Sequence, residues 1–176
     1  MTMKRYTKSV QCAVRYCTDL FLLLVLLAAS GCKHLDDDRI PPAPVHLAFN
    51  TVAEWNKYGV AGALGSKRYI RSERVPADFP YTAMSQTGFG GLLIVGDILG
   101  APRAYDLACP VECRADVRIA IDNETAKAYC PKCKSVYDVF TNYGQPLSGP
   151  ALEYNYGLRK YYIGAGSQGE YMLVTR

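Results

Sequence analysis

Four cysteines constrain the fold of this 176-residue chain more than any other feature. They form two close pairs, Cys109-x3-Cys113 and Cys130-x2-Cys133, and sixteen residues separate the pairs. Two loops at this separation, about the length of a hairpin, can each supply two thiolates to one point. Four such thiolates bind a zinc ion or an iron–sulfur cluster. Because a secreted domain with four cysteines is ordinarily disulfide-bonded, the spacing alone leaves a metal site and two disulfides as alternatives.

The amino terminus predicts export and lipidation. Basic residues precede a run of ten apolar residues from Leu20 to Ala29. A helix of that length spans about 15 Å, half of the roughly 30 Å hydrocarbon core, so the run indicates a secretory signal and not a membrane span. The following Ser30-Gly31-Cys32 completes a stretch that resembles the lipobox of bacterial lipoproteins. The resemblance implies cleavage after residue 31 and a lipid on Cys32, which would anchor the protein to a membrane.

The segment after Cys32 predicts a disordered tether. Residues 33–45 hold three Asp and three Pro and show no hydrophobic period, so they cannot bury enough surface to offset the entropy of ordering. The run Asp36-Asp37-Asp38 resembles the surface-export signal of some outer-membrane lipoproteins. The expected organisation is a signal peptide at 1–31, a lipidated cysteine with its tether at 32–45, and a folded domain at 46–176. The expected location is the cell envelope, on the periplasmic or the outer face of the outer membrane.

The charge distribution excludes a nucleic-acid-binding domain. The chain has 20 basic and 16 acidic residues, a net charge of +4. Residues 1–31 carry four basic residues and one acidic residue, so they account for +3 of that charge. The folded part therefore lacks the basic stripe that binding to a polyanion requires.

From residue 46 onward the sequence predicts an all-β domain. Short apolar or alternating segments are separated by glycine and proline, and no window shows a long amphipathic helix. This pattern favours a β-sandwich or barrel and argues against α/β nucleotide-binding folds. The expected strands are His46–Phe49, Tyr69–Arg71, Gly91–Val95, Val117–Ile121, Val136–Phe140, Arg159–Ile163 and Tyr171–Thr175, with one helical turn within Thr51–Tyr58.

Three stretches of the chain resemble Rieske iron–sulfur domains. Cys130–Asp138 reads CPKCKSVYD and Gly149–Ala151 reads GPA, whereas the family reads C-P-x-H-G-S-x-Y-D followed by a G-P-A loop. Tyr105–Pro110, with the sequence YDLACP, is similar to the first cluster loop of the family. The resemblance covers roughly residues 88–175. It implies a Rieske-like β-sandwich or barrel with a small two-loop cysteine subdomain, of the rubredoxin or zinc-ribbon kind, at about 105–151.

The same resemblance implies roles for residues around the metal. In Rieske domains, hydroxyls at the positions of Ser135 and Tyr137 donate hydrogen bonds to cluster and cysteine sulfur, which raises the reduction potential. Gly149 and Pro150 correspond to the loop that covers the cluster.

The departures from the Rieske pattern concern the metal ligands. The family needs two histidines, but Val111 and Cys133 occupy their positions, and both histidines of this chain precede the loops. An all-cysteine [2Fe–2S] cluster should have a potential near that of plant ferredoxins, about −400 mV, whereas a zinc ion would use the same sulfurs without redox chemistry. Glu112 could add a hard ligand, although a carboxylate there is more often solvated. The expected ligands are Cys109, Cys113, Cys130 and Cys133.

Two functional classes follow from these expectations. In the first, a membrane-anchored domain transfers single electrons through a [2Fe–2S] cluster to an unidentified redox partner. In the second, the same fold is a non-redox binding or structural module, held by zinc or disulfides, that contacts a surface protein. An enzyme acting by itself is not expected, because the chain is too short for a separate catalytic iron domain and offers no Ser/His/Asp set.

Overall fold

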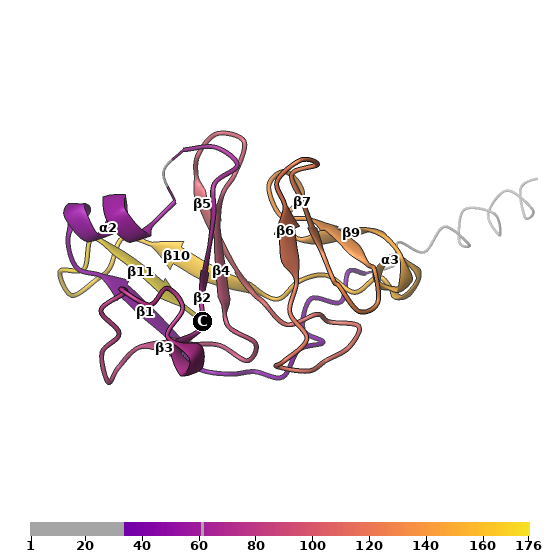
Figure 1. The fold of residues 1–176 in the computed structure, drawn as a ribbon, viewed down its shortest axis with the longest axis horizontal. Helices are drawn as coiled ribbons and strands as arrows, with labels where there is room; N and C mark the ends of the chain where they lie inside the picture. Colours follow the sequence, from indigo (N-terminus) through magenta and orange to yellow (C-terminus); the bar gives the residue numbers. More distant parts are fainter. Residues whose placement is uncertain (1–33, 61) are drawn as a thin grey trace, which may run out of the picture. The chain divides into compact units, whose positions relative to one another are not determined.

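The computed structural model describes residues 34–60 and 62–176, and Leu35–Arg176 form one compact unit (Figure 1). The predicted signal peptide and Cys32 lie outside the described residues. Within the described part of the chain, no helix is both long and apolar enough to cross a membrane. Strands dominate the unit and its helices are short, which confirms the predicted all-β class.

The larger of two sheets has seven antiparallel strands and is barrel-like, nearly closed on itself (Figure 1). Strand β1 shows why such segments form this sheet. Its side chains alternate between fully or nearly fully buried and half-buried positions, the period that places one face of a strand in a core. In sheet order the strands are β2 (Ser66–Tyr69), β4 (Leu92–Gly96), β5 (Pro102–Asp106), β10 (Lys160–Gly164), β11 (Met172–Thr175), β1 (Val45–Phe49) and β3 (Gln86–Thr87).

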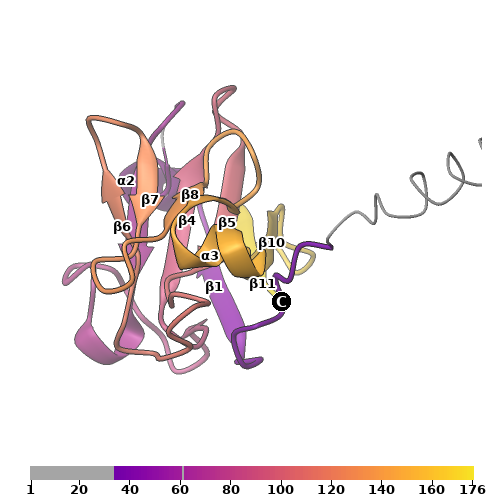
Figure 2. The same cartoon turned by 90° about the vertical axis from the view of Figure 1, so that its right-hand side faces the viewer.

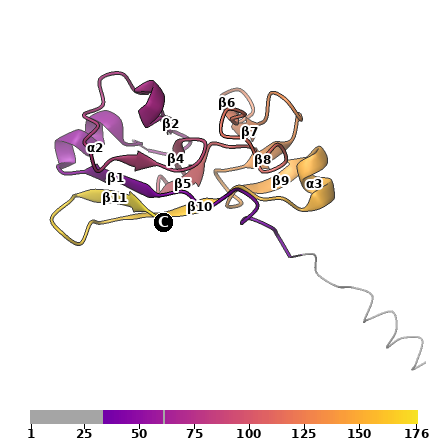
Figure 3. The ribbon, with the colours of Figure 1, turned by 90° about the horizontal axis from the view of Figure 1, so that it is seen from below.

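The smaller sheet is an antiparallel meander of four strands, and helix α3 (Pro150–Tyr154) follows its last strand (Figure 2). It lies within the span predicted for the cysteine subdomain. Figure 3 shows this sheet and α3 at one end of the unit and helix α2 (Val52–Tyr58) at the other. The single turn of 3-10 helix is η1 (Arg71–Glu73). The four strands are β6 (Ala120–Asp122), β7 (Lys127–Tyr129), β8 (Val136–Asp138) and β9 (Gln145–Ser148).

Two hydrophobic clusters fill the unit, and β4 contributes to both. Its Leu92 and Ile94 belong to one cluster, while Leu93 and Val95 belong to the other, so the strand is buried along its whole length. The first cluster is aromatic and centres on Phe79, which makes edge-on contacts with Phe49, Tyr58, Tyr69 and Tyr81. The second contains side chains of both sheets together with two of the cysteines. The cysteines therefore lie in the core that joins the two sheets.

The predicted tether is ordered from Leu35 onward, which corrects the expectation of a disordered segment. Ile40 is fully buried, and its carbonyl accepts a hydrogen bond of 3.0 Å from the guanidinium of Arg159. The carboxylate of Asp37 forms an ion pair of 2.7 Å with Lys160. Local composition indicates disorder, but acidic side chains and backbone carbonyls of the segment bind cationic partners more than a hundred residues away in the sequence.

Replacing Ile40 with alanine tests this packing. A fully buried isoleucine loses its burial and leaves a cavity, so we expect the free energy of unfolding to fall by about 2–5 kcal/mol. The matched control is Ile98→Ala, because the Ile98 side chain is 56% exposed and should change stability by no more than about 0.5 kcal/mol. Urea unfolding followed by tyrosine fluorescence measures both. Equal stability of the two variants would mean that the segment does not pack against the domain in solution.

Candidate metal centre

A buried carboxylate fixes the loop that carries Cys109. Asp106, at the end of β5, is fully buried and accepts four hydrogen bonds of 2.7 to 2.9 Å. The donors are the backbone amides of Phe89, Gly90 and Ala108 and the hydroxyl of Tyr161. Because every contact of this carboxylate holds backbone or a neighbouring strand in place, its role is structural.

Both cysteine loops begin where a buried cysteine leaves an extended segment. The amide of Cys109 donates to the carbonyl of Val117 at 2.9 Å, and the amide of Cys130 donates to the carbonyl of Ser135 at 2.9 Å. Each cysteine is followed by a proline and a turn. These bonds close each turn on itself, and both buried cysteines belong to the core that joins the sheets.

Three of the four predicted ligands gather at one point. The sulfurs of Cys109, Cys130 and Cys133 all lie within 4.8 Å of one another, and the first and last are 3.5 Å apart. Cys109 and Cys130 are fully buried, and Cys133 is half-buried. Three sulfurs so arranged can hold a metal ion.

Cys113 does not join this group in the structure. Its sulfur lies 3.5 Å from the carbonyl oxygen of Arg39, and its backbone has a φ of 51°. All four described cysteines are free. Even the 3.5 Å between the sulfurs of Cys109 and Cys133 far exceeds the 2.05 Å of a disulfide bond. The predicted group of four is therefore a group of three, with Cys113 turned to another segment.

Two hydroxyls face the sulfurs, at the positions that the Rieske resemblance indicates. The Tyr137 oxygen is 3.6 Å from the sulfur of Cys109, and the thiol of Cys133 donates to Ser135 Oγ at 3.2 Å. The amide of Ala151 also donates to Ser135 Oγ at 3.0 Å. Both hydroxyl side chains are fully buried, so they contact the sulfurs without competition from water.

The surroundings of the three sulfurs raise the pKa of the Cys109 thiol and lower the pKa of the Cys133 thiol. Burial raises the pKa of the Cys109 thiol to about 12. Burial also opposes ionisation of Cys133, but its hydrogen bonds with Ser135 and with the other cysteines outweigh that effect and lower the pKa of its thiol. Thiolates are the metal ligands, so a cation entering the site would have to displace the proton that burial holds on Cys109.

Gly149 packs closely against Ser135, and Pro150 follows it at the start of α3. Gly149 has a φ of 75° and a ψ of −170°, a conformation that is essentially restricted to glycine. A Cβ atom at this position would lie 2.9 Å from the Cα of Ser135. Pro150 opens α3, where its missing amide hydrogen costs nothing. This loop therefore lies close against the Ser135 backbone, and its Ala151 amide holds the Ser135 hydroxyl that faces Cys133.

Replacing Gly149 with alanine should lower the free energy of unfolding by at least about 1–3 kcal/mol, the cost of the strained backbone alone. The matched control is Gly169→Ala, because Gly169 also has a positive φ, but a Cβ added there would have no atom within 4 Å. The contact with Ser135 should make the loss at Gly149 the larger of the two in thermal unfolding. If Gly169→Ala loses as much stability, the close contact with Ser135 adds nothing to the cost at Gly149.

The sequence also contains a signal that cysteine counting overlooks. Both loops start with a Cys-Pro pair, and aligning the pairs places Glu112 opposite Cys133, with Cys113 opposite Lys134. In the structure Glu112 forms an ion pair with Lys132 of the other loop.

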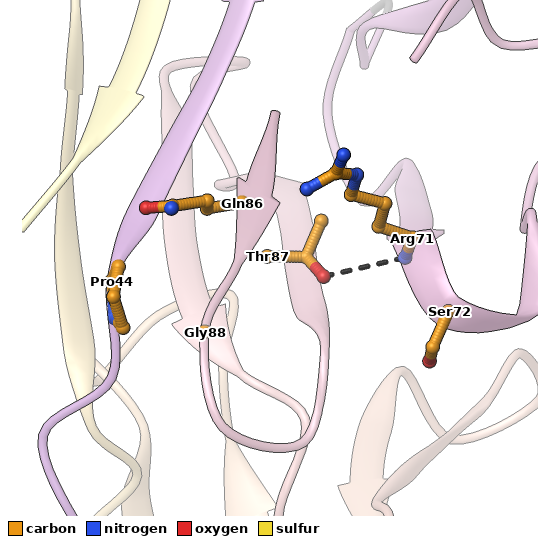
Figure 4. Close-up of a pocket in the computed structure, with 6 residues that line it drawn as sticks. All are labelled: Pro44, Arg71, Ser72, Gln86, Thr87 and Gly88. Atoms are coloured by element: carbon orange, nitrogen blue, oxygen red, sulfur yellow. Dashed lines mark hydrogen bonds between the residues drawn. The ribbon is translucent and has the colours of Figure 1, made fainter. Parts of the chain in front are cut away.

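A separate open cavity of about 500 Å³ lies away from the cysteine loops in sequence (Figure 4). Its lining contains no carboxylate, histidine or cysteine, and its internal contact is the bond of 3.3 Å from the Arg71 amide to Thr87 Oγ1. The lining residues are Pro44, Arg71, Ser72, Gln86, Thr87 and Gly88.

No family model matches this chain, and no curated protein and no solved structure matches it either. Inferences about its function therefore depend on the three sulfurs and on the side chains that surround them.

Proposed function

We propose that this protein is an envelope lipoprotein whose β domain holds one metal ion on Cys109, Cys130 and Cys133, as a structural and binding module. The mutual distances of the three sulfurs carry the proposal. A tetrahedral zinc site with bonds of about 2.3 Å places neighbouring sulfurs about 3.8 Å apart. The sulfurs here, all within 4.8 Å of one another with one pair at 3.5 Å, need only small shifts to reach that spacing.

The position of the site favours a role in stability. The strands of the smaller sheet contain three or four residues each, too short to be stable without further support. The sulfurs lie in the hydrophobic cluster that joins this sheet to the larger one. An ion there would link the two loops, and the free energy of its binding would add to that of folding.

The second candidate function is one-electron transfer through a [2Fe–2S] cluster on the cysteines. The hydroxyls of Tyr137 and Ser135 next to the sulfurs favour it, because such donors tune the potential of a cluster. A cluster needs two ligands on each iron, so Cys113 would have to leave the carbonyl of Arg39. The three-sulfur arrangement suits a single ion better, which is why we rank this function second.

Metal analysis of the mature protein separates the two functions. A colourless protein with one zinc per chain would support the structural site. Iron and acid-labile sulfide in equal amounts, with visible absorption, would support electron transfer through a cluster. Metal-free protein that binds neither Zn²⁺ nor reconstituted iron and sulfide would contradict both.

The membrane anchor is a separate part of the proposal, supported by the lipobox-like stretch that ends at Cys32. Replacing Cys32 with serine should move the protein from the membrane to the soluble fraction, because no acyl chain can then be attached. Cell fractionation and intact-mass measurement check this. An unmodified Cys32 in membrane-bound protein would contradict lipidation and leave the metal site untouched.

A further inference from the structure

The two cysteine loops are copies of the same turn. In each loop a buried cysteine precedes a proline, and the amide of the fifth residue donates back to the carbonyl of that cysteine. These bonds are Cys113 to Cys109 at 2.8 Å and Lys134 to Cys130 at 3.0 Å. The fifth residue has a positive φ in both loops, 51° and 61°. The loops can therefore be compared position by position.

The fifth position points away from the sulfurs in both loops. In the second loop, the Lys134 side chain is exposed and its ammonium donates to the carbonyl of Pro131 at 2.6 Å. In the first loop, the sulfur of Cys113 lies at the carbonyl of Arg39. The fourth position of the second loop is the ligand Cys133. Its counterpart in the first loop is Glu112, and not Cys113.

Glu112 has the surroundings of a ligand. It lies three residues after Cys109, inside the turn that the bond from the Cys113 amide to the Cys109 carbonyl closes, which keeps it next to the group of three. Its side chain is only 16% exposed, and its carboxylate pairs with Lys132, which reaches across from the second loop. A carboxylate that binds zinc is normally hydrogen-bonded through its other oxygen, and Lys132 is placed to be that partner.

We propose that Glu112 supplies the fourth ligand of the centre, completing a Cys3Glu site for a divalent ion, and that Cys113 is not a ligand. The proposal rests on the metal site proposed above. In the structure the carboxylate oxygens of Glu112 lie outside the group of sulfurs, so the proposal requires the Glu112 side chain to rotate toward the ion. Three thiolates and one carboxylate leave a divalent site with a net charge of −2, which the Lys132 ammonium partly offsets.

Cobalt substitution tests the ligand set, because the visible bands of tetrahedral Co²⁺ depend on how many sulfurs bind it. The full mature chain is loaded with Co²⁺ as wild type, Glu112→Gln, Glu112→Cys and Cys113→Ser. Wild type should show the spectrum of three sulfurs and one oxygen. Glu112→Gln should lower the affinity at least tenfold, the lower part of the range that even an indirect partner causes. Glu112→Cys should add a fourth sulfur, so its charge-transfer absorption rises by about a third.

Cys113→Ser is the matched control and should keep the wild-type spectrum and affinity. If this variant loses a sulfur signal while Glu112→Gln binds normally, Cys113 is the fourth ligand and the proposal for Glu112 is wrong, although the metal centre stands. If both variants keep the wild-type spectrum, water is the fourth ligand and the proposal also fails. If wild type itself binds no Co²⁺, the proposed function fails instead.

Discussion

Replacing Cys130 with serine should abolish metal binding and lower the free energy of unfolding by several kcal/mol. Cys130 is fully buried and is one of the three sulfurs within 4.8 Å of one another, so its loss leaves two thiolates, too few to hold an ion firmly. An ion present at a thousand times its dissociation constant stabilises the folded state by about 4 kcal/mol. That stabilisation disappears with the ligand, and the serine hydroxyl is also left in an apolar core. Denaturant unfolding with and without a chelator, together with metal analysis, measures both effects.

The matched control for this prediction is Cys113→Ser. It makes the same chemical change in the neighbouring loop, at a half-buried sulfur that lies 3.5 Å from the carbonyl oxygen of Arg39. We expect its metal content to be unchanged and its stability to lie within about 0.5 kcal/mol of wild type. A chelator should then destabilise wild type and Cys113→Ser equally but leave Cys130→Ser unaffected. If both serine variants lose metal equally, Cys113 is a ligand and the site has four thiolates.

Most of the group of neighbouring sulfurs could be predicted from the sequence. Cys109, Cys130 and Cys133 follow from spacing, and the Rieske-like motif indicated the contacts of Ser135 and Tyr137 with sulfur. The wrong expectation was that Cys113 would lie with them. The spacing gives only the positions of the cysteines along the chain. The positive φ at the fifth position of the turn directs the Cys113 side chain away from the three sulfurs.

Strands were predictable where their own residues alternate strongly. They were not predictable where only pairing with a neighbouring strand makes the segment a strand. The predicted strand at Arg159–Ile163 is β10, displaced by one residue. The segment Val117–Ile121 alternates, yet only its end enters β6, because Arg118 instead forms an isolated bridge with Ala108 in the first loop. β5 and β9 begin with or contain proline and show no clear alternation, so sequence patterns do not reveal them.

The domain should also lose stability steeply above about pH 10. Tyr69, Tyr105 and Tyr161 are buried, and burial raises the pKa of each phenol, with the Asp106 carboxylate adding to the effect at Tyr161. The pKa of Tyr105 rises to about 12. In the unfolded chain a tyrosine loses its proton near pH 10. Between pH 10 and the higher pKa of the folded state, the unfolded state binds fewer protons than the folded state. The contribution of these tyrosines to stability is therefore complete below pH 10 and falls as the pH rises.

Each such tyrosine should contribute about 1.4 kcal/mol per pH unit, so these three alone give a slope of at least about 4 kcal/mol per unit. Since small domains have about 5–15 kcal/mol of stability in total, unfolding should be complete within a few units above pH 10. Tyr105→Phe should reduce the slope by about 1.4 kcal/mol per pH unit, because that residue no longer ionises in the unfolded chain. Tyr162→Phe is the control: its side chain is 60% exposed, and the slope should not change. Urea unfolding at intervals from pH 9 to 12 measures these slopes. If the stability of Tyr105→Phe declines with pH as steeply as that of wild type, alkaline unfolding comes from other groups, and Tyr105 is not buried as a neutral phenol.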